Sequence, residues 1–191
     1  MSEYRVRTAT INDIDFIVNA IIQAEKSGSE LLSFSTIFNI KEEEVIRILR
    51  LILLEEVDGC EFSLTNYIVA ELNGLPVGAI GAWVERAETS SSTIKNNLLN
   101  YFLTKPSIVY ASRDARIASE LVIENVRDAL SLVVVYISPE HRGRHLFDLM
   151  TIGHINRNPG IKELAIQVMA NNYYAIRSYK NYGFTTCYVR R

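Results

Sequence analysis

The sequence predicts an α/β fold in which helices flank a mixed β-sheet. Apolar residues recur with a period of two around 66–85, which is typical of an antiparallel hairpin, and with a helical period on either side. A strand, a crossover helix and another strand follow between 131 and 170. That order implies a parallel strand pair joined by a right-handed connection.

The bulk composition predicts one domain covering 1–191. A net charge of −2 argues against nucleic-acid binding, which normally needs a basic surface. The opening segment MSEYRVRTATINDID has no apolar signal region, and the most apolar helical stretch is too short to cross a bilayer. We therefore expect a cytoplasmic protein without a membrane partner. Cys60 and Cys187 show no metal-ligand spacing, so we expect no bound metal.

The first third of the chain predicts a strand followed by two helices. Residues 4–9 alternate like a strand, and Thr10 with Asp13 marks a helix start. The triplet Ser27–Gly28–Ser29 ends this helix, and a second helix is expected over 41–56. Their apolar stripes consist of Ile14, Ile17, Val18 and Ile21 in the first helix and Val45, Ile48, Leu49 and Ile52 in the second.

The middle of the chain predicts a hairpin and then a helical insertion. Strands are expected over 66–72 and 77–85, with the turn Asn-Gly-Leu-Pro between them. Residues 86–129 are polar at first and then helical, so they form an insertion before the fourth strand. The last insertion helix is indicated by Ile117, Leu121, Val122, Val126 and Ala129.

The remaining chain predicts strand, helix, strand, helix and strand. Residues 131–137 are continuously apolar, which favours a central strand covered on both faces. After the turn Pro-Glu-His-Arg-Gly-Arg, a helix would bury Leu146, Leu149, Met150 and Gly153. Strands are expected over 163–170 and 185–191, on either side of a helix that Gly183 closes.

Two motifs in this part of the chain resemble those of the GNAT acyltransferases, which move an acetyl or similar group from coenzyme A to an amine. One is the apolar strand followed by Ile-Ser-Pro-Glu-His-Arg-Gly-Arg at a helix start. The other is Asn-x-x-Ala-x-x-x-Tyr-x-x-x-Gly-Phe, which runs from Asn172 to Phe184. The resemblance covers most of the chain in element order. It implies a GNAT-like sheet with a truncated C-terminal end, because the family's seventh strand has no sequence after Phe184 from which to form.

The resemblance also implies acetyl-CoA as co-substrate, held by its pyrophosphate at the turn. Arg142 matches the first position of the family pattern Arg/Gln-x-x-Gly-x-Gly/Ala, whereas His145 and Phe147 stand at its two glycine positions. Backbone amides remain available there, although the two side chains could crowd the phosphates. The implied cofactor-binding residues are Val135, Ile137, Arg142, Gly143, Arg144, His145, Leu146, Phe147 and Asn172.

The same resemblance assigns Tyr179 as the general acid that protonates the departing thiolate. A phenol can donate to a thiolate at neutral pH because it remains protonated there. Residues 131–137 carry no carboxylate to act as a base, so Glu85 is the base candidate, with Tyr136 and ordered water as others. Each residue also has a plain structural alternative: a buried ring for Tyr179, a helix cap for Asn172, and solvent exposure for Glu85 and the arginines.

The function expected from this comparison is acetyl transfer from acetyl-CoA to a small-molecule or peptide amine. The alternative is a non-catalytic GNAT-like module that binds coenzyme A weakly or not at all and acts through protein interaction. Loss of the last strands would leave a sheet edge uncovered, so we also expect that the chain can form a homodimer.

Overall fold

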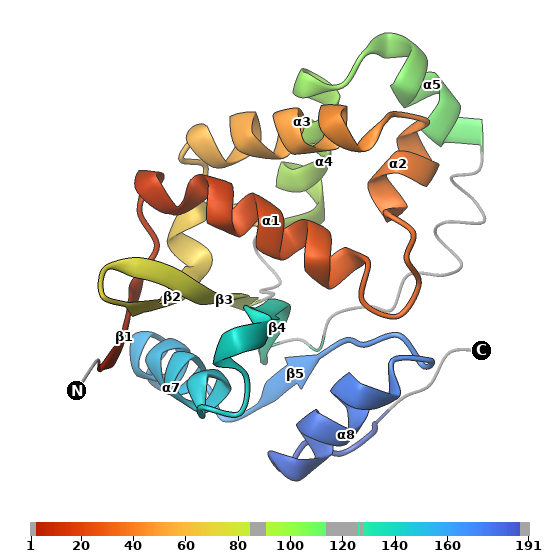
Figure 1. The fold of residues 1–191 in the computed structure, drawn as a ribbon. Helices are drawn as coiled ribbons and strands as arrows, with labels where there is room; N and C mark the ends of the chain where they lie inside the picture. Colours follow the sequence, from red (N-terminus) through yellow and green to blue (C-terminus); the bar gives the residue numbers. More distant parts are fainter. Residues whose placement is uncertain (1–2, 85–90, 114–125, 127, 188–191) are drawn as a thin grey trace.

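The computed structural model describes residues 3–84, 91–113, 126 and 128–187. Its centre is a five-stranded sheet in the order β1-β2-β3-β4-β5 (Figure 1). The first four strands pair antiparallel, and β4 pairs with β5 in parallel, so the predicted mixed sheet is confirmed. The strands are β1 (Tyr4–Thr8), β2 (Tyr67–Leu72), β3 (Leu75–Val84), β4 (Leu130–Ile137) and β5 (Leu164–Ile166).

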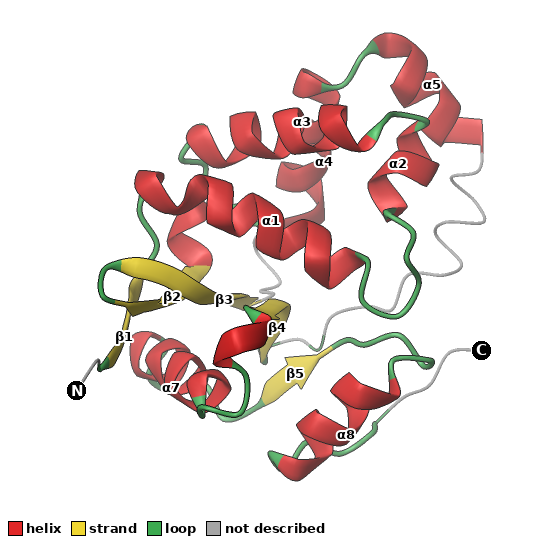
Figure 2. Cartoon of the chain, viewed as in Figure 1, coloured by secondary structure: helices red, strands yellow, loops and turns green. Residues whose placement is uncertain are grey.

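Helices cover both faces of this sheet (Figure 2). The N-terminal helices and the insertion lie on one face: α1 (Ile14–Glu25), α2 (Ser33–Phe38), α3 (Glu42–Leu54), α4 (Ser91–Phe102) and α5 (Lys105–Arg113). On the other face lie α7 (Leu146–Arg157) and α8 (Tyr173–Asn181). Short 3-10 turns at Ile11–Asp13, Leu64–Asn66 and Pro139–His141 lead into α1, β2 and the start of α7. No described helix is long and apolar enough to span a membrane.

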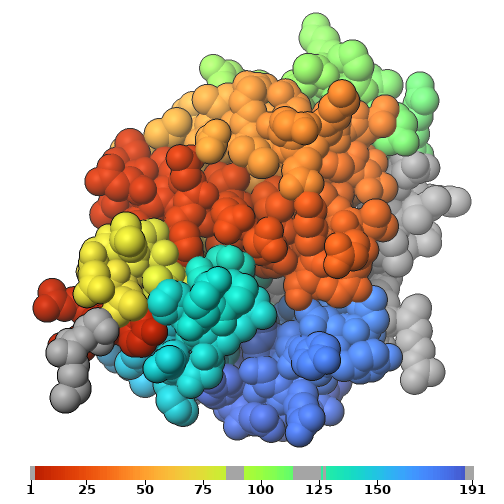
Figure 3. All heavy atoms as spheres, viewed as in Figure 1, coloured from red at the N-terminus to blue at the C-terminus, as the bar shows by residue number. Residues whose placement is uncertain are grey.

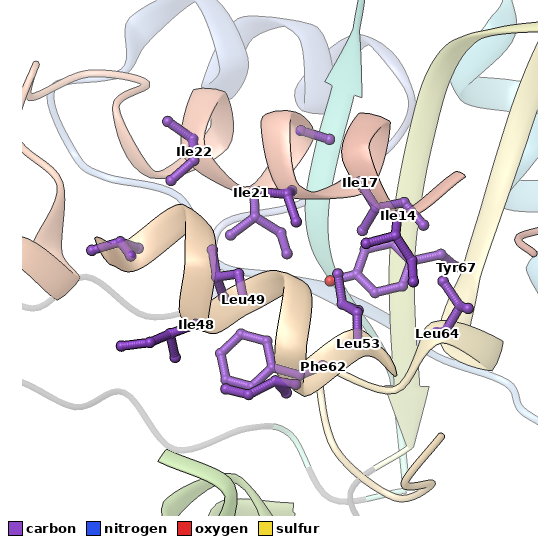
Figure 4. Packing of buried hydrophobic residues seen from close by; sticks show 14 of the residues in the cluster. Ile14, Ile17, Ile21, Ile22, Ile48, Leu49, Leu53, Phe62, Leu64 and Tyr67 are labelled. Carbon is purple, nitrogen blue, oxygen red and sulfur yellow. The ribbon is translucent and has the colours of Figure 1, made fainter. Parts of the chain in front are cut away.

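The first hydrophobic core fills the space between α1, α3 and the sheet. Ile14, Ile17 and Ile21 of α1 face Leu49 and Leu53 of α3 (Figure 4). Both predicted apolar stripes are buried, so these two helices are confirmed with boundaries shifted by a few residues. The short helix α2 was not predicted.

The second core lies between the opposite sheet face and α7. Leu146 and Met150 are buried there as predicted, but Leu149 is 39% exposed, so its predicted inward position is wrong. Phe147 and His154 are buried instead. Helix α7 thus packs on the sheet with the face that carries Leu146, Met150 and His154.

The β2–β3 hairpin turns through two residues rather than the four predicted. Asn73 and Gly74 both have positive φ, at 54° and 80°, and Leu72 pairs with Leu75. This is the geometry of a type I′ turn, which Asn-Gly favours.

A β-bulge interrupts the pairing of β3 with β4. Ile80 pairs with Val135 but Ala82 pairs with Leu132, so β4 contains one extra residue opposite Gly81. A Cβ on Gly81 would lie 2.9 Å from Cε1 of Tyr67 and would therefore clash. The bulge places Val135 on the α7 side and Val134 on the α1 side.

Three predictions about the later chain need correction. The strand expected over 163–170 is only Leu164–Ile166, because the chain then diverges from β4. Residues 185–187 form no strand, and the rest of the predicted last strand lies outside the described residues. Val126 and Ala129 are not helical, while the other stripe residues of that predicted helix, Ile117, Leu121 and Val122, also lie outside the described residues.

Candidate functional site

The sheet opens between β4 and β5. The two strands pair only from Leu130 to Leu132 of β4, and no described strand pairs with that side of residues 133–137. Beyond Ile166 the chain moves away from β4 toward α8 (Figure 1). We call the space between 133–137 and 167–172 the β4–β5 gap. Unpaired backbone groups along such an edge can bind an extended ligand as a strand would.

The turn between β4 and α7 lies at the end of this gap. Gly143 and His145 both have positive φ, at 72° and 59°, and α7 begins directly after them. Among the described residues, nothing accepts a hydrogen bond from the backbone amides of 144–147. Free amides and the helix dipole make this end of α7 attractive to an anion. Figure 3 shows the region around the turn (teal) at the molecular surface, beside the segment that contains α8 (blue).

Positive side chains surround the turn. Arg142 donates from Nε to the carbonyl oxygen of Ile137 at 3.1 Å, which holds its guanidinium at the end of β4. Arg144 is exposed, and no described carboxylate forms an ion pair with either arginine. The imidazole of His145 is 83% exposed and lies 3.1 Å from the carboxylate of Asp148. It therefore extends into solvent rather than packing on the helix.

Phe147 has a clear packing role. Its ring is buried between α7 and α8, with ring centroids 5.7 Å from Tyr179, 4.6 Å from Tyr182 and 6.5 Å from Phe184. These contacts join α7 to α8. The side chain at the second glycine position thus points toward α8, and the backbone amide of Phe147 stays free.

Tyr179 is held in this aromatic cluster. Burial raises the pKa of its phenol to about 12, so the hydroxyl remains protonated near neutral pH. None of the described residues donates to or accepts from this hydroxyl. A protonated, unpartnered phenol is compatible with a proton donor, and the role remains a prediction.

Asn172 caps a helix, which was the structural alternative to a coenzyme contact. Its Oδ1 accepts from the backbone amide of Ala175 at 3.2 Å, which caps α8. Its Nδ2 donates to Oγ of Ser27 at 2.7 Å, in the loop between α1 and α2. A contact with coenzyme stays a prediction.

The other predicted residues are divided between the two faces. Val135 and Ile137 belong to the part of β4 that pairs with β3 but not with β5, and they pack on the α7 side, near the turn. Tyr136 packs on the opposite side, 5.9 Å from Phe16 in α1. Glu85 lies outside the described residues. Within the described chain, no three His, Cys, Asp or Glu side chains gather as a metal site would require.

Sequence reasoning missed two features of this site. The contact of Ser27 and Gly28 with the start of α8 joins residues more than 140 positions apart, and only the Gly28 signal for a close approach was present in the sequence. The hydrogen bond between Tyr4 and His141, with 3.0 Å between Oη and Nδ1, ties β1 to the turn and had no sequence signal.

Comparison with known proteins identifies the fold. Neither a protein-family model nor a curated protein matches the sequence. Solved structures do match: an N-acetyltransferase from Staphylococcus aureus Mu50 has a TM-score of 0.66 at 16% identity, covering 95% of this chain and 90% of that one. A GCN5-related N-acetyltransferase from Ralstonia eutropha JMP134 has a TM-score of 0.55 at 13% identity, with 99% and 97% covered.

A third structure contains ligands. Diaminobutyrate acetyltransferase from Paenibacillus lautus, in complex with L-2,4-diaminobutyric acid and coenzyme A, has a TM-score of 0.51 at 15% identity, covering 95% of this chain and 75% of that one. These structures thus share the overall fold of this chain over most of its length. The chain has the fold of the GNAT N-acetyltransferases.

Proposed function

We propose that this protein transfers an acetyl group from acetyl-CoA to a small-molecule or peptide amine. The observation that carries the proposal is the continuity of two features, because the unpaired edge of β4 leads directly into a turn with free amides and two arginines. One feature suits the extended pantetheine arm and the other suits the diphosphate. The GNAT fold supports this choice, and one structural neighbour is a coenzyme A complex.

The proposed reaction is a direct displacement. The neutral amine attacks the thioester carbon, and the carbonyl oxygen becomes an oxyanion that an amide of the 133–137 edge would stabilise. The C–S bond then breaks as the tetrahedral intermediate collapses. The leaving sulfur takes the proton from Tyr179, and the tyrosinate regains a proton from water. The amine proton passes to water, with Glu85 as the other base candidate.

The free phosphate-binding groups give the first test. Acetyl-CoA at about 100 times its Kd should stabilise the protein by about 2.7 kcal/mol, which corresponds to a rise in Tm of roughly 5–10 °C. Acetyl-pantetheine, which lacks the diphosphate, should give a much smaller rise. Replacing both Arg142 and Arg144 with Gln should reduce the effect of acetyl-CoA.

Arg157→Gln is the matched control, because Arg157 lies at the opposite end of α7. No change in Tm with millimolar acetyl-CoA would contradict the proposal. An equal effect of acetyl-CoA and acetyl-pantetheine would contradict the diphosphate assignment.

A second candidate is a GNAT-like module without catalysis that acts through protein interaction. The ring contacts of Phe147 with Tyr179 and Tyr182 favour it, because they restrict the phenol that should donate the proton. Acetyl-CoA hydrolysis or acetyl transfer to a panel of amines separates the two functions. Binding without any turnover would support the module, whereas transfer that depends on Tyr179 would support the enzyme.

A further inference from the structure

We infer that Asn172 acts in this chain as a positioning residue rather than as a coenzyme contact. With Asn171 it binds Ser27 and Gly28 of the α1–α2 loop, and we call these four residues the latch. The latch ties the outer edge of the β4–β5 gap to the α1–α2 loop. What the gap binds rests on the proposed function, whereas the latch itself does not.

The latch consists of hydrogen bonds between two distant segments. Nδ2 of Asn171 donates to the carbonyl oxygen of Gly28 at 2.6 Å. Nδ2 of Asn172 donates to Oγ of Ser27 at 2.7 Å and lies 3.4 Å from the carbonyl oxygen of Ser27. Two adjacent asparagines therefore bind two adjacent loop residues.

Gly28 allows the two segments to approach this closely. Its φ is +98°, and a Cβ added there would lie 3.2 Å from both Oδ1 of Asn171 and Cβ of Asn172. Any other residue would strain the loop backbone and press on the two asparagines. The loop sequence is thus fitted to the start of α8.

The oxygen and the NH₂ group of the Asn172 side chain both already have hydrogen-bond partners. Its oxygen caps α8 through the amide of Ala175, and its NH₂ group is directed at Ser27. A coenzyme contact through this NH₂ group would have to compete with the contact to Ser27.

The latch matters because, among the described residues, no strand pairs with the chain after Ile166. Residues 168–172 follow β5 without pairing to β4, and Met169, Ala170 and Asn171 are exposed. Segments with few buried contacts open easily. When the latch is intact, this edge is ordered before a ligand arrives, so binding does not have to supply the cost of ordering it.

The test uses matched variants and the affinity for acetyl-CoA measured by titration calorimetry. Ser27→Ala removes the hydroxyl partner, and Asn172→Ser keeps a good helix cap but is too short to reach Ser27. Each should weaken acetyl-CoA binding by about 3–10-fold, the effect of one hydrogen bond. The double variant should bind acetyl-CoA no more weakly than the weaker single variant. Ser27→Thr, which keeps a hydroxyl, should bind acetyl-CoA with the affinity of the wild type.

Ser29→Ala is the control, because the Ser29 hydroxyl bonds within its own loop, to the carbonyl oxygen of Leu31. Wild-type affinity in Ser27→Ala together with weak binding in Asn172→Ser would overturn the inference, since Asn172 would then contact the coenzyme. Unchanged affinity in both variants, or losses that simply add in the double variant, would also overturn it.

Hydrogen exchange of the ligand-free protein separates the latch from the proposed function. Both single variants should accelerate amide exchange over 167–176 and in the α1–α2 loop, whether or not the wild type binds acetyl-CoA. If the wild type binds no acetyl-CoA and amide exchange is still faster in the two variants, the latch is supported and the proposed function is contradicted. Unchanged exchange in both variants would refute the latch.

Discussion

The region built from α1, α3 and the first three strands is packed very differently from β5 and α8. Helix α1 buries six residues against α3 and the sheet, and β3 buries most of its length. By contrast, α8 has no fully buried residue, and β5 is three half-buried residues long. The first region supplies stability, and the second borders the candidate site and carries Tyr179. Proteins commonly place binding elements in their less stable parts.

The largest expected effect tests this division of packing. Ile17 is fully enclosed in the first core, whereas Ile176 of α8 is half-buried. Ile17→Ala should lower the free energy of unfolding by about 2–5 kcal/mol, because it leaves a cavity. Ile176→Ala should cost about 1 kcal/mol or less. Urea denaturation measures both, and equal losses would contradict the comparison.

The buried His154 of α7 gives the stability of the protein a pH dependence. Its Nε2 lies 2.8 Å from the carbonyl oxygen of Ile80 beside the bulge, and burial lowers its pKa from 6.5 to about 4. Between these values the unfolded chain binds the proton and the folded chain does not. Stability is therefore complete above pH 6.5 and falls as the pH drops toward 4, by roughly 3 kcal/mol in total.

His154→Gln provides the control for this pH effect, because glutamine is an uncharged donor. Urea unfolding at several pH values should show a smaller loss on acidification for the variant than for the wild type. Parallel curves for the two proteins would mean that other groups cause the loss.

Tyr179 tests the chemistry of the less packed region. Tyr179→Phe should reduce kcat by about 10–100-fold while the Kd for acetyl-CoA changes little, because only the proton donor is lost. Burial raises the phenol pKa to about 12, so the wild-type hydroxyl stays protonated through pH 10. The ratio of wild-type to variant rates should thus be constant from pH 6.5 to 9.5. Equal rates would remove Tyr179 from the mechanism.

The smallest effect concerns the backbone of the turn. His145 adopts a left-handed conformation, so His145→Gly removes strain but loosens the unfolded chain. Thermal unfolding should show a net change within about 0.5 kcal/mol. Gly143→Ala should destabilise by about 1 kcal/mol, because its φ of +72° suits glycine. If His145→Gly destabilised the protein clearly and Gly143→Ala did not, the turn would have a different conformation.

The sequence predicted the well-packed region better than the site region. An apolar stripe such as Ile14 to Ile21 identifies the buried face of its helix, because the apolar face must be buried. The hairpin follows from the turn residues Asn73 and Gly74. Residues 163–170 look like a buried strand, but β5 ends at Ile166, β4 contains a bulge, and the following chain bonds to the α1–α2 loop instead. Neither long-range contact has a local signature. The role of Phe147 was likewise not predictable, because its partners Tyr182 and Phe184 lie far along the chain, just after α8.

The most direct test of the central claim is a titration of the ¹⁵N-labelled protein with acetyl-CoA, followed by amide chemical shifts. The proposed function predicts that the amides of 144–147 shift most, together with those of 133–137 along the open edge of β4. Shifts that leave these residues unchanged and occur elsewhere would contradict the assignment of the turn and the gap as the coenzyme site.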